Sequence, residues 1–206
     1  SNPNISMFER RMIEIPCRGE TIAVPIHLYA TDARDECRPV LMAGGGVDTF
    51  KMDFHPWCLA VTMNAGATTL AFDNPGTGEC PVALDENADE VIRGIASYAR
   101  SIGDGRVAHF GMSFGGNFSA MSGLAGIADC AVDLGWPCGG FVRAGTCGQP
   151  DGADDYFVPK SDTLVFEGRP DTEVHLIPGT GHVAMRKAAQ VVPVIIGWLR
   201  NQLKLA

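Results

Sequence analysis

Apolar and polar residues alternate at two places near the start of the chain. Residues 11–15 and 21–26 both show this two-residue period, which is typical of strands with one buried face. The segment between them, Cys17 to Glu20, holds a glycine and two charged residues that suit a hairpin turn. The pattern therefore predicts two antiparallel strands at an edge of a sheet.

From about residue 40, short apolar runs alternate with stretches of helical character. The expected strands are Val40–Met42, Thr68–Phe72, Arg106–Phe110, Cys130–Leu134 and Glu173–Ile177. The expected helices lie within Phe50–Met63, at about Glu86–Ser101, at Phe114 to about Leu124, within Ser161–Glu167, and in a last segment ending near Leu203. Strands and helices that alternate in this way predict an α/β fold, with a mostly parallel sheet covered by helices on both faces.

The stretch between Leu134 and Asp155 does not fit this alternation. A parallel crossover needs at least about a dozen residues, usually helical, and a further strand must then lead to Asp155. Only 20 glycine-rich residues are available, and neither element is visible in them. Two interpretations stay open: a glycine-rich bypass, or a sequence that omits residues here, such as those of a mobile lid around 135–152. In either case we expect a single domain over residues 1–206.

The composition of the chain indicates which classes of binding partner to expect. The chain has 206 residues, of which 46% are hydrophobic and 19% charged, so it is expected to be globular. Its net charge of −8 would repel phosphate backbones, which argues against nucleic acid as a partner. Apolar runs fall short of the ~20 residues that span a bilayer, so we expect no membrane partner. A homodimer stays open as the alternative to a monomer.

The cysteines and the N-terminus indicate a compartment. The seven cysteines are odd in number and none has CxxC spacing, which argues against a disulfide framework or a zinc site. Arg10, Arg11 and Glu14 interrupt any apolar segment that could act as a signal peptide. A reducing cytoplasm is therefore the simplest expectation.

Residues 111–115 form a G-x-S-x-G sequence with Ser113 at its centre. This spacing places a serine on a strained strand-to-helix turn, so that its Oγ projects above the sheet. An apolar run of strand length precedes Ser113 and a stretch rich in small residues follows it, as the turn requires. We therefore predict Ser113 as a nucleophile. The backbone N–H of Phe114 would then point into an oxyanion site at the helix N-terminus.

His182 ends a glycine-rich loop, residues 178–182, that follows an expected strand. Catalytic groups of open α/β sheets gather at the C-terminal edge of the strands. A neutral imidazole with a pKa of about 6.5 can accept the serine proton and return it to a leaving group, so we predict His182 as the base. The other histidines fit less well, because they lie in expected strands or in the first helix: His27, His55, His109 and His175.

Asp154 and Asp155 precede this histidine and compete for the role of the orienting carboxylate. The chain order Ser…Asp…His is that of one class of serine hydrolase and differs from two unrelated serine-protease orders. A carboxylate bonded to imidazole Nδ1–H fixes the tautomer and stabilises the imidazolium. The competing interpretation is a pair of solvated turn aspartates.

Two further glycine loops follow expected strands. Residues 44–46 are three glycines at the place where lipases and esterases carry an HGGG-type sequence, with Ala43 in place of the histidine. Gly46 or Val47 would supply a second oxyanion N–H. The alternative interpretation is a purely structural glycine turn. The loop Asp73–Glu79 fails the dinucleotide pattern G-x-G-x-x-G, because Pro81 occupies the third position. Asp73 and its glycines are therefore interpreted as structural.

Together, residues 45–49, 73–79, 111–116, 152–159 and 178–182 resemble the fermentation-respiration-switch esterase-like branch of the α/β-hydrolases. The resemblance extends from about Pro39 onward. It implies the α/β-hydrolase fold and a Ser-His-Asp triad, with no metal and no organic cofactor. Its G-x-x-D-x-x-V-P pattern selects Asp155 over Asp154 as the triad acid. Related branches cleave carbon–carbon bonds in β-dicarbonyl compounds.

The first hypothesis is therefore hydrolysis of a small-molecule ester or similar acyl substrate through an acyl-enzyme on Ser113. The alternative within enzymes is C–C bond hydrolysis of β-dicarbonyl compounds, in which carbon rather than oxygen must be protonated. An alternative from another class is a non-catalytic binding module on a hydrolase scaffold, because fold alone does not dictate function.

Overall fold

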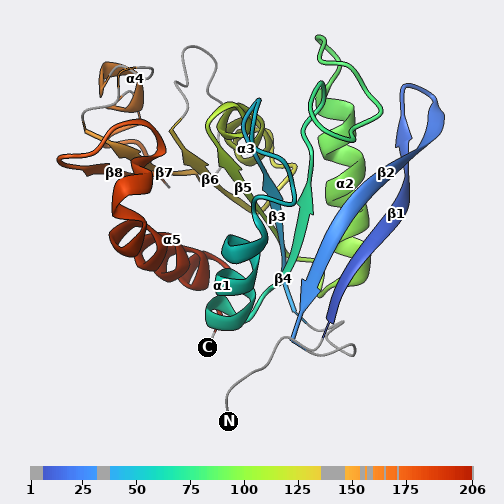
Figure 1. Ribbon diagram of the computed structural model, residues 1–206, viewed down its shortest axis with the longest axis horizontal. Helices are drawn as coiled ribbons and strands as arrows, with labels where there is room; N and C mark the ends of the chain where they lie inside the picture. Colours follow the sequence, from blue (N-terminus) through green and yellow to red (C-terminus); the bar gives the residue numbers. More distant parts are fainter. Residues whose placement is uncertain are drawn as a thin grey trace.

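A single eight-stranded sheet forms the centre of the molecule, with the strand order β1-β2-β4-β3-β5-β6-β7-β8 (Figure 1). The computed structural model describes residues 7–31, 38–135, 147–153, 156, 160–164, 166–170 and 172–205. β1 pairs with β2 and β2 with β4 in antiparallel fashion, and all other neighbouring strands are parallel. The strands are β1 Met7–Cys17, β2 Glu20–Ala30, β3 Val40–Gly44, β4 Thr68–Phe72, β5 Val107–Met112, β6 Cys130–Leu134, β7 Cys147–Gly152 and β8 Thr172–Ile177.

Helices cover both faces of the sheet. α1 and α5 lie next to each other on one face, and α2 and α3 pack on the other (Figure 1). The helices are α1 His55–Ala65, α2 Asp89–Ile102, α3 Phe114–Leu124, α4 Lys160–Leu164 and α5 Ala188–Gln202, and a 3-10 helix, η1, spans His182–Lys187. The sheet therefore has two apolar layers, one on each side.

The composition of the central strands explains why helices cover both faces of the sheet. Every residue of β3, β4, β5 and β6 is buried, as expected for parallel strands with helices on both faces. On α2 the buried residues Val91, Ile92, Ile95 and Ala99 recur at helical spacing, so this helix presents one apolar stripe to the sheet.

The expected fold class is confirmed: a mostly parallel sheet with helices on both faces and an antiparallel N-terminal hairpin. Three elements have the bounds expected from the sequence: β4, β6 and α3. β1 occupies the edge of the sheet, whereas β2 lies one place in, because it also pairs with β4. His27 and His175 lie in strands, and His109 is buried in β5, as expected.

The strand that must precede Asp155 is present, although it was not visible in the sequence. β7 runs through Cys147–Gly152, in the glycine-rich stretch, and pairs in parallel with both β6 and β8. Residues 136–146, which would hold the crossover, lie outside the described residues. The proposed omission of a lid falls in the same stretch, so the structure does not test it. Helix α1 begins at His55, inside the expected range and after a turn over residues 51–54, and it ends at Ala65, beyond the expected limit of Met63.

Candidate active site

Ser113 lies in the sharp turn between β5 and α3. Its backbone has φ 52° and ψ −126°, a left-handed conformation that costs energy for a residue with a side chain. The two glycines that flank it allow the close approach: an added carbon at Gly111 would overlap the carbonyl of Gly115, and one at Gly115 would overlap that of Gly45. The strained strand-to-helix turn expected for G-x-S-x-G is therefore present.

His182 reaches this turn from the far end of the sequence. Its Nε2 lies 2.8 Å from Ser113 Oγ, although the two residues are 69 positions apart. His182 follows β8 and the glycine-rich loop over residues 178–181, and it is the first residue of η1. For the hydroxyl to donate to Nε2, the ring must carry its proton on Nδ1. In that tautomer Nε2 can accept the serine proton.

The backbone just after His182 is strained. Val183 and Ala184 have φ values of 51° and 49°, and a β-branched residue in this region is a genuine outlier. Both side chains are buried, and Val183 packs against the backbone of Gly135 at the end of β6. A hydrogen bond from Ala184 N to Gly181 O, 2.9 Å, closes the turn. Tertiary packing therefore holds the imidazole at the nucleophile.

The predicted orienting carboxylate lies outside the described residues, as does its rival Asp154. The chain just before them is described. Gly152, the last residue of β7, pairs with Ile177, the last residue of β8, and Ala153 N donates to Ile177 O at 2.9 Å. In the chain, Asp155 is thus two residues after Ala153, which is hydrogen-bonded to the end of β8. The loop to His182 leaves the sheet at that same end.

The glycine loop, defined here as residues 44–50, runs beside the nucleophile. A carbon added to Gly46 would lie 3.3 Å from Ser113 Cβ and 3.6 Å from its Oγ, so Gly46 is in near contact with the serine. Val47, which follows it, is 64% exposed. Phe114 is the first residue of α3, at the helix N-terminus beside the same serine. The structure therefore brings Gly46, Val47 and Phe114 to one place around Ser113.

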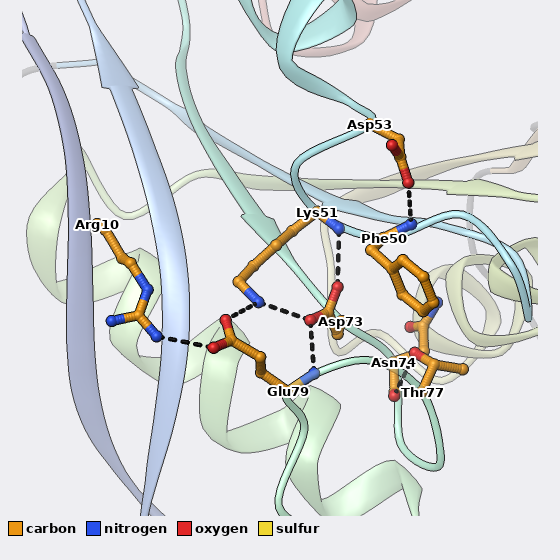
Figure 2. Close-up of polar contacts among 8 residues, drawn as sticks. All are labelled: Arg10, Phe50, Lys51, Asp53, Asp73, Asn74, Thr77 and Glu79. Atoms are coloured by element: carbon orange, nitrogen blue, oxygen red, sulfur yellow. Dashed lines mark hydrogen bonds and ion pairs between the residues drawn. The ribbon is translucent and has the colours of Figure 1, made fainter.

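Sequence reasoning missed two of the three residues that hold this loop. Asn74 Nδ2 donates to Gly45 O at 2.7 Å, and the Lys51 ammonium pairs with Asp73 Oδ2 at 2.6 Å (Figure 2). The structural interpretation of Asp73 agrees with these contacts, whereas Lys51 and Asn74 had been assigned no role. The available signal was a single lysine between Phe50 and Met52, shortly after the three glycines.

Other nucleophiles and bases are less suited to chemistry. Burial raises the pKa of the Cys58 and Cys130 thiols to about 12, so both are protonated at neutral pH. Burial lowers the pKa of His109 to about 3, and its Nδ1 lies 2.8 Å from Ser122 Oγ. Within the described ranges, Cys17, Cys58, Cys80 and Cys130 are free thiols.

The described residues contain no group of three or more histidine, cysteine or acidic side chains that could hold a metal ion. None of the helices described is both long and apolar enough to cross a bilayer.

Solved structures share this architecture across almost the whole chain. An esterase from Pyrococcus furiosus has a TM-score of 0.77 at 12% identity, over 95% of this chain and 93% of that one. A putative dienelactone hydrolase from Klebsiella pneumoniae gives 0.73 at 14%, over 94% and 99%. A lidless α/β serine hydrolase from Xanthomonas campestris gives 0.67 at 16%, over 98% and 96%.

Comparisons at the level of sequence give no such likeness. No protein-family model matches the chain, and no curated protein matches it. At identities this low, agreement with solved structures establishes architecture alone. The chain therefore has the α/β-hydrolase fold.

Proposed function

We propose that this protein is a serine hydrolase that cleaves an ester or a similar acyl compound through a covalent acyl-enzyme. The observation that carries the proposal is the 2.8 Å approach of His182 Nε2 to Ser113 Oγ at a strained strand-to-helix turn. A hydroxyl becomes nucleophilic at neutral pH when an adjacent base can take its proton. The motifs around this pair also support placing the chain in the fermentation-respiration-switch esterase-like branch.

In the first half of the proposed reaction, Ser113 Oγ attacks the substrate carbonyl carbon while His182 takes the hydroxyl proton. The carbonyl oxygen becomes an oxyanion that accepts hydrogen bonds from Phe114 N–H and from Gly46 or Val47 N–H. The tetrahedral intermediate then breaks its bond to the leaving group, which receives the proton from His182. The acyl group stays on Ser113 as an ester.

In the second half, water attacks the acyl-enzyme with His182 again as base, and the carboxylic acid leaves. Asp155 is proposed to accept the Nδ1–H of His182, which keeps Nε2 free to act and stabilises the imidazolium. The departure of the His182 loop and of residue 153 from the same sheet edge supports this assignment. Val47, Phe50 and Met52 are exposed in or just after the glycine loop, and their apolar side chains suit an uncharged organic acyl group.

The direct test is hydrolysis of p-nitrophenyl esters by the wild type and by Ser113→Ala and His182→Ala variants. Each substitution should lower kcat by about 10⁴- to 10⁶-fold, because the nucleophile and its base act as a unit. A fluorophosphonate probe should modify Ser113 in the wild type, as peptide mass spectrometry would show. A folded wild type that neither labels nor turns over any ester would leave the binding-module hypothesis standing.

The acid assignment has a matched pair of variants. Asp155→Asn should lower kcat by about 10⁴-fold, because it favours the wrong tautomer of His182. Asp154→Asn, one residue away and of the same chemistry, should retain activity. The reverse outcome would transfer the role to Asp154. Assaying β-diketones in parallel separates ester from C–C hydrolysis, since only a C–C hydrolase would consume them.

A further inference from the structure

Asn74 and Asp73, in the loop that follows β4, fasten the glycine loop at two points, and Figure 2 shows the contacts of Asp73. At its start, Gly45 O accepts a hydrogen bond of 2.7 Å from Asn74 Nδ2. Just past its end, Lys51 N donates to Asp73 Oδ1 at 2.7 Å, and Lys51 Nζ pairs with Asp73 Oδ2 at 2.6 Å. The two fastenings come from consecutive residues, and the segment between them contains Gly46 and Val47.

The lysine in this arrangement is an unusual buried charge. Lys51 is only 1% exposed, and its ammonium lies 2.6 Å from both Asp73 Oδ2 and Glu79 Oε2. Arg10 of β1 completes a chain of ion pairs by binding Glu79 Oε1 at 2.8 Å (Figure 2). This chain joins two cations and two carboxylates, so it carries no net charge. Lys51 also lowers the pKa of the Glu79 carboxyl by hydrogen bonding to it.

Buried ion pairs of this kind are poor sources of stability, because desolvation offsets most of their attraction. They can instead fix one geometry, since a displaced partner leaves an uncompensated charge in the interior. Asp73 is well placed for that role: its two oxygens also bind two backbone N–H groups, those of Lys51 and Glu79, at 2.7 and 2.8 Å. The carboxylate therefore sets the positions of two loops at once.

Asn74 fixes the loop from the side of the nucleophile. Its side chain is 1% exposed and fills the space between the glycine loop and the first turn of α3. A carbon added to Gly44 would lie 2.9 Å from both Asn74 Nδ2 and Oδ1, and one added to Gly115 would lie 2.8 Å from Nδ2. Asn74 thus contacts the glycine loop and the turn that carries Ser113 together.

We infer that Lys51, Asp73 and Asn74, here called the loop anchor, are positioning residues that hold the glycine-loop oxyanion donor at its working distance from Ser113. The inference rests on the proposed function, because it assigns a purpose to geometry within that site. Oxyanion donors must lie about 2.7–3.1 Å from the position where the charged oxygen develops. A small shift of the loop therefore reduces stabilisation of the transition state more than it reduces the affinity for substrate. The loop anchor should therefore act on kcat and leave KM nearly unchanged.

The test compares kcat and KM for p-nitrophenyl acetate in Asn74→Ala, Lys51→Met and the double variant Lys51→Met/Asp73→Asn. The double variant keeps the interior neutral, so it covers the case in which Lys51→Met alone fails to fold. We expect kcat to fall about 10- to 100-fold, less than the 10²–10³ of losing a donor outright, with KM changed less than about threefold. Val91→Ala, a core truncation in α2 that removes none of these polar contacts, should leave kcat unchanged despite lower stability.

A second readout separates positioning from general damage. An alkyl boronic acid that bonds to Ser113 mimics the tetrahedral intermediate, so its inhibition constant should rise in proportion to the loss of kcat/KM across the loop-anchor variants. Folded variants with wild-type kcat, or with boronate affinity unchanged while kcat falls, would overturn the inference. A wild type that does not hydrolyse esters or label at Ser113 would instead overturn the proposed function.

Discussion

The imidazole of His109 lies on β5, four residues before Ser113, and takes no part in the proposed chemistry. It is fully buried and lies 2.8 Å from Ser122 Oγ. Its Nε2 is buried and has no hydrogen-bond partner among the described residues. Burial lowers its pKa to about 3, so the ring stays neutral near neutral pH. His109, on the strand that leads to Ser113, therefore does not compete with His182 for the proposed role of base.

This buried ring should make folding sensitive to acid. Between pH about 6.5 and about 3 the unfolded chain binds a proton at His109 that the folded chain rejects, so the ring's contribution is full above about pH 6.5 and is lost as pH falls. The expected slope is up to about 1.4 kcal/mol per pH unit. Urea unfolding of the wild type and His109→Gln at several pH values between 7.5 and 4.5 measures it. Parallel stability curves for the two proteins would contradict the assignment.

The residues of the candidate site differ in the sequence signal by which they could be found. Ser113 stands in a local motif whose spacing is itself the geometric requirement, so five residues were enough to find it. His182 followed from its place after a strand. Lys51 was missed because its role depends on Asp73, 22 positions away, and a distant ion pair leaves no periodic trace in the chain.

At the scale of elements, α2 packs on β1 through a glycine. A carbon added to Gly94 would lie 2.9 Å from Ile15 Cβ and Cδ1 and 3.1 Å from Pro16 O, so the helix approaches the strand where a side chain has no room. Gly197 in α5 offers the opposite case, with open space at the same position and an exposed surface. The two helices thus provide a matched pair of glycines.

Alanine at these two positions should have different effects. Gly197→Ala should raise stability by about 0.5–1 kcal/mol, because glycine in a helix interior costs that much conformational entropy. Gly94→Ala has the same gain in propensity but overpacks the contact with Ile15, at a cost of about 1–3 kcal/mol. Thermal unfolding of both variants isolates the packing cost as their difference. Equal stabilisation would mean that β1 can move away from α2.

The element that sequence missed, β7, shows where pattern reasoning fails. Its residues, Cys147–Gly152, include two glycines and a proline and no β-branched side chain, so local preference argues against a strand. The strand exists because β6 and β8 flank it and supply partners for its backbone. By contrast, β4 and β6 were found at their observed bounds because they are short, mostly apolar segments next to turn residues.

At the scale of the whole molecule, the sheet separates two apolar layers. Ile92 of α2 belongs to the layer on one face, and Ile195 of α5 to the layer on the other. Each is buried to within 1% of complete burial. Because the sheet lies between them, truncating one side chain should leave the packing around the other unchanged.

Removing one methylene from each layer tests this independence. Ile92→Val and Ile195→Val should each cost about 0.5–1.5 kcal/mol of unfolding free energy. In the double variant the costs should add to within about 0.5 kcal/mol, as for distant sites without shared partners. Denaturant unfolding with a common m-value provides the comparison. A coupling well beyond that margin would show that the sheet transmits strain between its faces.

The left-handed backbone at Val183 and Ala184 gives the histidine side of the site a particular dependence. Two consecutive unfavourable residues persist only while β6 and α5 oppose their return to ordinary angles. Should that enclosure loosen, the peptide would unwind toward a relaxed form, and the imidazole would rotate out of line with the hydroxyl. The proposed reactivity of Ser113 therefore depends on the packing of β6 and α5, and a substitution in that packing, remote from both side chains, should abolish the reactivity without touching either.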